Sequence, residues 1–167
     1  MMTSKECSAM YMDENTFKTV VENMPLVSVD LIVKKDNKYL LGRRVNKPAR
    51  GYWFTLGGRV LKNERILDAI HRISHLELGT KIERPLKFLG VFEHLYDDAI
   101  YDGVSTHYVN LGYEVETSTL EDLPDDQHSD YRWFDLEELM ESKEVHDYVK
   151  DYFRQSKGSV PQSEGEK

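Results

Sequence analysis

One expected helix carries an acidic residue on a face that should be buried. The helix is expected from about 64 to 78, and its apolar residues share one arc at ~100° per residue: Ile66, Ala69, Ile70, Ile73 and Leu76. Glu77 follows Ile73 by one helical turn and falls inside the same arc. A carboxylate on a buried face must be paired, hydrogen-bonded or bound to a cation. An arginine partner, or solvent reaching a frayed helix end, is the ordinary alternative to a metal site.

The segment before this helix offers groups suited to a phosphate. Gly57 and Gly58 follow an expected strand, so the backbone there can approach a ligand closely. Arg59 comes next, and a cation near a helix start favours phosphate. A Gly-Gly pair alone usually marks a turn. With a cation and a buried-face acid, it forms a set that can hold Mg²⁺ and a diphosphate, because Mg²⁺ prefers oxygen ligands and bridges to substrate phosphates.

The elements that must position these residues alternate between helical and strand patterns. Asp13 is expected to cap a short helix that ends at Pro25, and Asp36-Asn37 to join the first two strands. Strands are expected over these ranges: 26–33, 38–43, 86–96, 106–116 and 131–134. Asp135 caps a closing helix that either continues to Tyr152 or breaks near Ser142. The pattern predicts an α/β fold, with helices packed on both faces of a mixed sheet.

Length and charge limit the classes of protein. The 167 residues fit one domain, expected over 13–155 between a flexible N-terminal arm (1–12) and a flexible C-terminal tail (156–167). The net charge of −8 argues against a general nucleic-acid binder, which needs surplus Lys and Arg. The single cysteine, Cys7, excludes an internal disulfide. We find neither a signal-peptide pattern nor a membrane-length apolar run, and we expect a cytoplasmic protein with no membrane partner.

The spacing of the glycines and charged residues resembles the Nudix signature. Gly58, Glu64, Arg72, Glu77 and Gly79 stand in register with it. Ile73 and Leu76 stand where the family has two further glutamates, and Ser74 where it has an aliphatic residue. The resemblance implies a Nudix-type α/β/α sandwich.

The flanking sequence is similar to one branch of that family, the GDP-mannose mannosyl hydrolases, from about residue 16 to 153. The matching stretches are PLVSVDLIV (25–33), LLGRRVNKPARGYWF (40–54), GGRV (57–60), GVFEHLYDD (90–98), THY (106–108) and LPDDQHSDYRW (123–133). That branch also lacks the two glutamates. Leu56 departs from the proline expected before Gly-Gly.

The branch implies hydrolysis of GDP-mannose, and of GDP-glucose, to GDP and free sugar. Water attacks the anomeric carbon with inversion, and one Mg²⁺ per site, with Mn²⁺ as a substitute, helps GDP to leave. A general acid is then unnecessary, and a base for water is the main requirement. The resemblance also implies a homodimer.

By the same resemblance, Mg²⁺ is held by the Gly57 carbonyl, Glu77 and Gln127, and His128 is the general base. Arg44 and Arg59 contact the diphosphate, and Tyr108 donates to the leaving phosphate oxygen.

The roles of Arg72 and Asp30 stay open between two alternatives. Arg72 either contacts the diphosphate or pairs with Glu64, and Asp30 either shapes the sugar site or is a paired acid at the edge of the core. His94 is assigned to the sugar side, whereas His146 is expected to be a bystander.

Two other functions compete with the sugar hydrolase. A pyrophosphatase would cut between the phosphates, but the residues at 73 and 76 are not acids. A non-catalytic nucleotide-sugar sensor would keep the arginines without needing Gln127 and His128.

Overall fold

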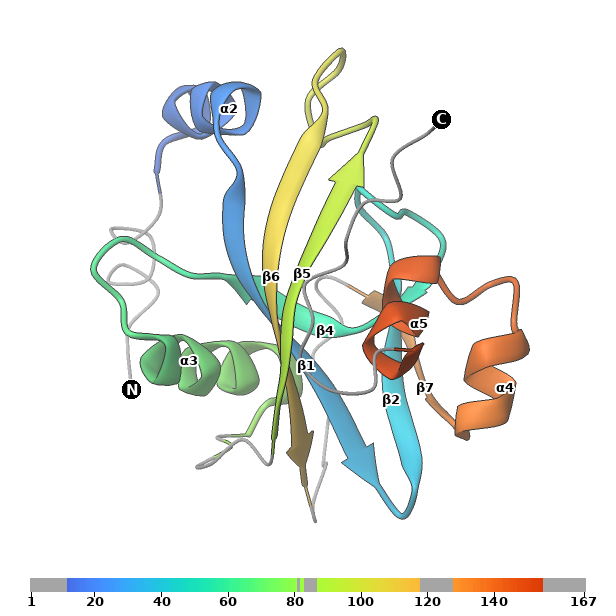
Figure 1. Ribbon diagram of the computed structural model, residues 1–167. Helices are drawn as coiled ribbons and strands as arrows, with labels where there is room; N and C mark the ends of the chain where they lie inside the picture. Colours follow the sequence, from blue (N-terminus) through green and yellow to red (C-terminus); the bar gives the residue numbers. More distant parts are fainter. Residues whose placement is uncertain (1–11, 81, 83–86, 118–127, 155–167) are drawn as a thin grey trace, which may run out of the picture.

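A mixed β-sheet with helices on both faces forms the body of the protein (Figure 1). The computed structural model describes residues 12–80, 82, 87–117 and 128–154. The helices are α2 (Glu14–Asn23), α3 (Ile66–Leu78), α4 (Leu136–Glu141) and α5 (Asp147–Arg154). The strands are β1 (Leu26–Lys35), β2 (Lys38–Arg44), β3 (Trp53–Phe54), β4 (Leu56–Arg59), β5 (Lys87–Tyr96), β6 (Thr106–Glu116) and β7 (His128–Phe134). The sandwich predicted from the sequence is confirmed.

The first strand organises the sheet. Its full length pairs in parallel with β6, while its other edge pairs with β4 over the first half and with β2 over the second. The hairpin between β1 and β2 turns at Asp36 and Asn37, both with positive φ, as a tight two-residue hairpin turn requires. The β4 pairing places Gly57 opposite Asp30 and Gly58 opposite Val29. Strand β1 therefore brings the glycine pair to the centre of the sheet.

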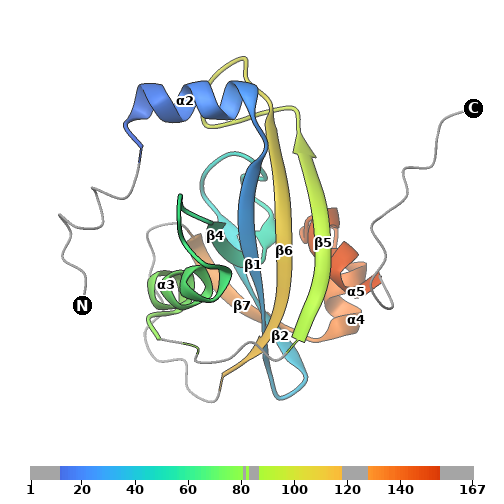
Figure 2. The same ribbon diagram turned by 60° about the vertical axis from the view of Figure 1, so that its left-hand side comes forward.

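One face of the sheet, here called the α3 face, is covered by α3 (Figure 2). Aliphatic side chains fill the space between them. The buried members of this cluster include Val29, Leu31, Leu56, Ile70 and Ile73. Two expectations for α3 were wrong. The helix begins at Ile66 rather than near 64, because its N-cap residue, Arg65, has an extended backbone with φ −74° and ψ 150°. Leu76 is 43% exposed, so the buried arc is narrower than predicted.

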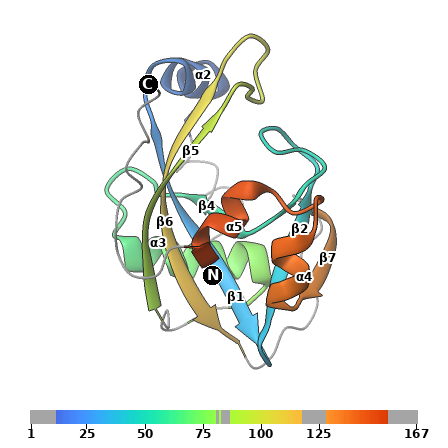
Figure 3. The ribbon, with the colours of Figure 1, turned by 45° about the vertical axis from the view of Figure 1, so that its right-hand side comes forward.

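The opposite face, here called the α5 face, is covered by α4 and α5 (Figure 3). Its core is aromatic and includes Trp53, Phe92, Phe134 and Tyr152. The closing segment does break, as one alternative predicted: Ser142 ends α4, and α5 starts afresh at Asp147. Asp135 caps α4 by accepting a hydrogen bond from Glu138 N at 2.8 Å.

The N-terminal helix α2 begins as predicted, with Asp13 accepting a hydrogen bond from Thr16 N at 3.0 Å. It lies at one end of the sheet, next to the loop between β5 and β6. Phe17 and Val21 pack there against Tyr101, Val104 and Tyr108. Within the described residues, no helix combines the length and apolar character of a membrane span.

Candidate active site

A cavity of about 320 Å³ lies beside strands β1, β4 and β6. Asp30, Gly57 and Tyr108 line it from these three strands. That volume is at the lower end of the range for small-molecule sites. Eight of the ten residues predicted to form the site line it: Asp30, Arg44, Gly57, Arg59, Arg72, Glu77, His94 and Tyr108. Of the other two, Gln127 lies outside the described residues, and His128 is described through its backbone only. The fold thus brings residues that lie between Phe17 and Asn110 in the sequence to one cavity.

The cavity contains oxygen groups that suit a hard cation. Glu77, only 6% exposed, reaches it from the last turn of α3, and Gly57 lines it from β4. A Cβ atom at Gly57 would lie 2.5 Å from Val29 O and 2.7 Å from Asp30 Oδ1, so any other residue would push β4 away from β1. A carboxylate and a backbone carbonyl are ligands that Mg²⁺ accepts, so these residues fit the ion. The described residues contain no cluster of three or more His, Cys, Asp or Glu side chains that could hold a metal.

Arg72 is tied to Glu64, as one of its two readings predicted. Arg72 Nε donates to Glu64 Oε1 at 2.7 Å, and its Nη2 donates to Glu64 Oε2 at 2.9 Å and to Arg59 O at 2.7 Å. Burial alone would raise the pKa of Glu64, but the hydrogen bonds from Arg72 and Leu61 hold it below its ordinary value. This pair fixes the loop between β4 and α3, and Arg72 still lines the cavity.

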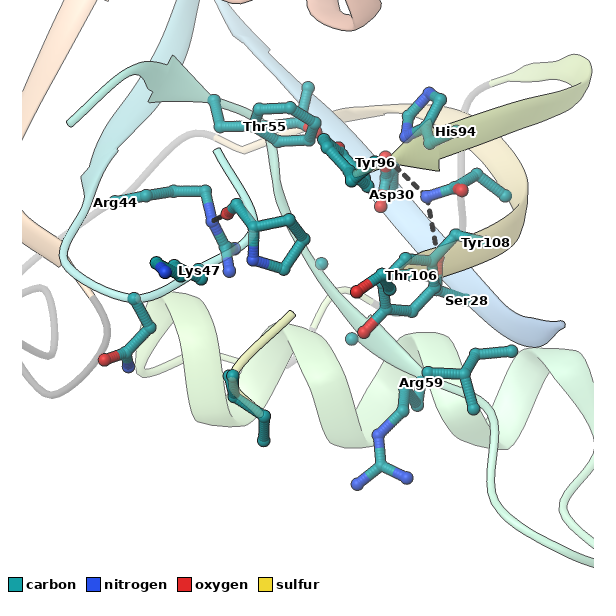
Figure 4. A pocket seen from close by; sticks show the side chains of 18 of the residues that line it. Ser28, Asp30, Arg44, Lys47, Thr55, Arg59, His94, Tyr96, Thr106 and Tyr108 are labelled. Carbon is teal, nitrogen blue, oxygen red and sulfur yellow. Dashed lines mark hydrogen bonds between the residues drawn. The ribbon is translucent and has the colours of Figure 1, made fainter. Parts of the chain in front are cut away.

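Two cations approach the cavity from different elements (Figure 4). Arg44, at the end of β2, donates a hydrogen bond from Nε to Pro48 O at 2.8 Å. This bond orients the guanidinium group. The Arg59 guanidinium lies 4.1 Å above the ring of Phe17 from α2. Lys47 also lines the cavity and was not predicted. Cations held on separate elements suit a ligand with more than one phosphate.

For the predicted general base, His128, the structure describes only the position of the backbone. His128 begins β7 and pairs with Arg44 across the β2–β7 ladder. This register sets residue 128 beside the end of the strand that carries a predicted phosphate ligand.

Asp30 is a buried acid held by partners from two other elements. Tyr152 Oη of α5 donates a short hydrogen bond to Asp30 Oδ2, and Asn110 Nδ2 of β6 donates to the same oxygen at 3.1 Å. Burial raises the pKa of Asp30 to about 6, against the opposing effect of the hydrogen bonds from Tyr152 and Asn110. Asp30 is thus both a paired acid of the core edge and a wall of the cavity.

His94 lies beside this acid in an aromatic setting. Only 1% of it is exposed, and it stacks on Tyr148 with ring centroids 4.3 Å apart and planes at 5°. Burial lowers its pKa to about 3, and the nearby His146 adds to this effect. His94 is therefore neutral at physiological pH. His146, expected to be a bystander, contacts the rings of Phe54 and Tyr148 but is absent from the cavity lining.

Tyr108 keeps its proton in this environment. Burial raises the pKa of its hydroxyl, and Arg59 and Arg44 only partly offset that effect. A protonated tyrosine next to two arginines can donate a hydrogen bond to an anionic oxygen. This is the chemistry predicted for it.

Several polar residues of the cavity were missed in the sequence. Ser28 lies two positions before Asp30 on β1, so strand alternation puts both on the same face. Asn110 interrupts an otherwise apolar stretch of β6, which was a readable signal. Thr55 joins β3 to β4 and is 4% exposed; nothing in the sequence distinguishes it from an ordinary strand threonine.

Two departures from the family pattern have structural explanations. Leu56, in place of proline, is fully buried on the α3 face and pairs with Leu31 in the β4–β1 ladder. Ser74, in place of an aliphatic residue, is also fully buried, and its hydroxyl accepts a hydrogen bond from Ile82 N at 3.1 Å. Neither change removes a cavity residue.

Comparison with known proteins agrees with this architecture. The family model described as NUDIX domain matches residues 24–155. Low-salt glycan biosynthesis protein Agl8 of Haloferax volcanii is 42% identical over 126 residues, which cover 73% of this chain and 78% of the relative. ADP-ribose pyrophosphatase of Methanocaldococcus jannaschii is 30% identical over 135 residues, or 80% of this chain and 76% of that one.

A solved structure, the MutT NUDIX hydrolase from Burkholderia pseudomallei, superposes with a TM-score of 0.67 at 26% identity. The match covers 81% of this chain and all (100%) of that one. The sheet and its flanking helices are thus shared with a known enzyme.

Proposed function

The chain belongs to the Nudix hydrolase family, and we propose that it hydrolyses GDP-mannose, and GDP-glucose as well, to GDP and free sugar in the presence of Mg²⁺. The observation that carries this proposal is the single carboxylate that α3 supplies to the cavity. Glu77 lines it, whereas the other α3 residues in the lining are Arg72, Ile73 and Leu76. One carboxylate suits a single ion that neutralises a leaving diphosphate, rather than a cluster of ions that activates water at phosphorus.

The relationship to a glycan biosynthesis protein supports a sugar-linked substrate. The cavity itself also supports one, because Arg44 and Arg59 can face a diphosphate. In the same cavity, Thr55, His94 and Asn110 offer polar groups to a sugar. The resemblance in the flanking sequence supplies the choice of GDP and mannose.

The bound metal would be held by Glu77, the Gly57 carbonyl and Gln127, and it would supply positive charge to the departing diphosphate. Arg44 and Arg59 reach the cavity from opposite sides and neutralise the same charge through hydrogen-bonding guanidinium groups. Tyr108, whose pKa is raised by burial, donates its proton in a hydrogen bond to the leaving oxygen. No strong acid is required, since GDP leaves as a stabilised anion.

Water must then attack the anomeric carbon from the side opposite the diphosphate. We assign His128 as the group that accepts the proton from that water, since an ordinary histidine titrates near neutrality. A single displacement inverts the configuration at that carbon.

A pyrophosphatase that attacks phosphorus is the second candidate. The 30% identity to an ADP-ribose pyrophosphatase favours it. The apolar residues Ile73 and Leu76 on α3 oppose it, because they leave one carboxylate where several would be needed.

Hydrolysis in ¹⁸O-labelled water separates these candidates. We expect the label in free mannose and none in GDP, with the β-anomer formed first from the α-linked substrate. Proton NMR must follow the anomeric signal within the first turnovers, because free sugars mutarotate. Label in GDP or GMP would assign attack to phosphorus, and the absence of any product would assign the chain to nucleotide-sugar binding alone.

The resemblance also supports a homodimer, and the single cysteine, Cys7, fits a reducing, cytoplasmic location. Light scattering on the purified chain tests the first of these.

A further inference from the structure

Three buried polar atoms in the cavity have no hydrogen-bond partner within the described part of the chain. They are Thr55 Oγ1, His94 Nε2 and Asn110 Oδ1. Their residues are 4%, 1% and 3% exposed, and all three line the cavity. Folded proteins satisfy nearly all buried polar groups, so three such atoms around one cavity indicate that a ligand completes them.

The contact with Asp30 selects one orientation for the amide of Asn110. Its Nδ2 donates to Ser28 Oγ at 2.7 Å and to Asp30 Oδ2 at 3.1 Å, which uses both of its N–H bonds. Rotating the amide would turn its oxygen toward the Asp30 carboxylate and replace that hydrogen bond with a repulsion, whereas the Ser28 hydroxyl can donate or accept in either orientation. The oxygen Oδ1 is therefore a fixed acceptor that lacks a donor.

The other two atoms are less restricted. Burial is the main effect on the pKa of Asp30, followed by the hydrogen bonds from Tyr152 and Asn110 and then by the nearby Thr55, which lowers it. The Thr55 hydroxyl nevertheless makes no hydrogen bond of good geometry. A hydroxyl donates and accepts, and a neutral imidazole nitrogen does one or the other. Together the three atoms offer a mixture of acceptors and donors without a formal charge.

We propose that Thr55, Asn110 and His94 form a hydroxyl-binding floor that recognises the sugar of a nucleotide-sugar substrate and thereby determines sugar specificity. His94 was already expected on the sugar side, whereas Thr55 and Asn110 are new assignments. The proposal rests on the proposed function for the nucleotide part of the ligand.

Charge excludes a phosphate from the floor. A phosphate there would face the Asn110 acceptor and the Asp30 carboxyl, both of which repel it. Figure 4 shows Thr55, Asp30 and His94 at the end of the cavity away from Arg59. A sugar hydroxyl both donates and accepts, so a polyol can satisfy all three atoms. The substrate therefore lies with its diphosphate toward the arginines and its sugar on the floor.

Binding measurements test this assignment without depending on turnover. Calorimetry compares GDP with GDP-mannose in Mg²⁺ buffer, on a His128→Ala background that preserves the sugar linkage. We expect Thr55→Val and Asn110→Leu each to weaken GDP-mannose binding by roughly 5- to 100-fold, the usual effect of losing a buried hydrogen-bond partner. GDP binding should change less than about twofold, because GDP does not reach the floor.

Two further variants serve as controls. Thr55→Ser keeps a hydroxyl and should recover most of the affinity lost in Thr55→Val. Thr19→Val makes the same change on α2, where the hydroxyl bonds only to Asn15 O at 3.0 Å, and should alter neither affinity.

GDP-linked mannoses that each lack one hydroxyl identify the contact directly. One such analogue should bind weakly to the parent protein, yet lose nothing more in Asn110→Leu, because its partner is already absent. Equal weakening of GDP and GDP-mannose, or no weakening of either, would refute the floor. Sugar-dependent losses without hydrolysis would support the floor and refute the hydrolase. Hydrolysis of GDP-mannose by the parent protein, with affinities that the variants leave unchanged, would support the hydrolase and refute the floor.

Discussion

The two faces of the sheet differ in what their cores can do. On the α3 face the buried residues are almost all aliphatic, and Ser74 and Glu77 are the buried polar residues of its helix. On the α5 face the core is aromatic, and its tyrosines carry hydroxyls through it. Tyr152 reaches Asp30, and Tyr148 both accepts from Leu95 N at 3.0 Å and donates to Leu95 O at 2.7 Å. The aliphatic core positions α3, whereas the aromatic core positions polar side chains and changes the pKa of Asp30.

This contrast separates two contributions to the cavity. The α3 face presents one carboxylate to the cavity, that of Glu77, from the last turn of a helix whose inner side packs on aliphatic residues. The α5 face presents a connected set, in which Asp30, Asn110 and Tyr152 share hydrogen bonds. A substitution of Glu77 on the α3 face should therefore affect metal binding and turnover alone. A substitution on the α5 face should also change the stability of the fold and its pH dependence.

The largest effect is expected from Glu77→Gln. An amide keeps the shape but is a poorer ligand for Mg²⁺. Turnover should fall by at least about 10²-fold, beyond the usual loss on removing an indirect metal partner. Stability in urea should change by less than about 1 kcal/mol, since no volume is lost. The same carboxylate-to-amide change at exposed Asp68, also on α3, should leave turnover intact. Full activity of Glu77→Gln at saturating Mg²⁺ would remove Glu77 from the site.

Two glycine substitutions compare the faces directly. A Cβ atom on Gly112 would lie 2.8 Å from Tyr152 Cε1, whereas one on Gly58 would lie 3.1 Å from Ile73 Cγ1. The tyrosine ring is held in a closed core, so Gly112→Ala should cost about 2–3 kcal/mol. Gly58→Ala needs a shift of only a few tenths of an ångström and should cost about 1 kcal/mol or less. Denaturant unfolding gives both values, and equal losses would contradict the difference between the faces.

His94→Phe tests the pH dependence of the α5 face. The pKa of His94 is about 3 when folded and 6.5 when unfolded, so the unfolded chain takes up this proton first. The stability due to neutral His94 is thus complete above pH 6.5 and falls as the pH drops toward 3. Between pH 6.5 and 5 the loss is about 2 kcal/mol.

Phenylalanine keeps the stacking on Tyr148 and cannot titrate, so the variant should lose much of this slope. His146, whose pKa is also lowered by burial, should retain a smaller one. Parallel stability curves for parent and variant would show that His94 is not held neutral. At pH 8 the variant should be folded but should bind GDP-mannose more weakly than the parent does.

The smallest effect is expected from Asp135→Ala, which removes the cap of α4 on the α5 face. The loss should be about 1 kcal/mol, with no change in the KM for GDP-mannose, because α4 contributes nothing to the cavity lining. A large KM change would mean that the aromatic core transmits even remote strain to the site.

The aliphatic side was the easier one to predict from the sequence. Ala69, Ile70, Ile73 and Glu77 are buried as the helical period requires, because an aliphatic face depends on periodicity alone. The predicted helix start was wrong because the helix begins after Arg65, whose side chain makes no capping hydrogen bond and which therefore gives no capping signal in the sequence. The sequence pattern also could not show that Arg72 binds Glu64 while it lines the cavity.

The aromatic side was harder, because its function lies in contacts between distant residues. Asp30 and Tyr152 are far apart in the sequence, and no local pattern joins them. The same holds for Asn110 and Ser28. His94 and Tyr108, which line the cavity, were singled out only through the resemblance to a known family. Unpaired atoms such as Asn110 Oδ1 become visible only when the partners of the same side chain are known.

The contact between Arg59 and Phe17 gives the N-terminal helix a share in anion binding. Helix α2 buries only Val21 fully, so the guanidinium over the Phe17 ring is a substantial part of its attachment. An anion that changes this contact must change the opening equilibrium of α2, and by reciprocity a loosened α2 must change the anion affinity by the same factor. Amide hydrogen exchange in α2 is therefore a reporter of occupancy at Arg59. Its protection factors would record a diphosphate whether or not any bond is broken.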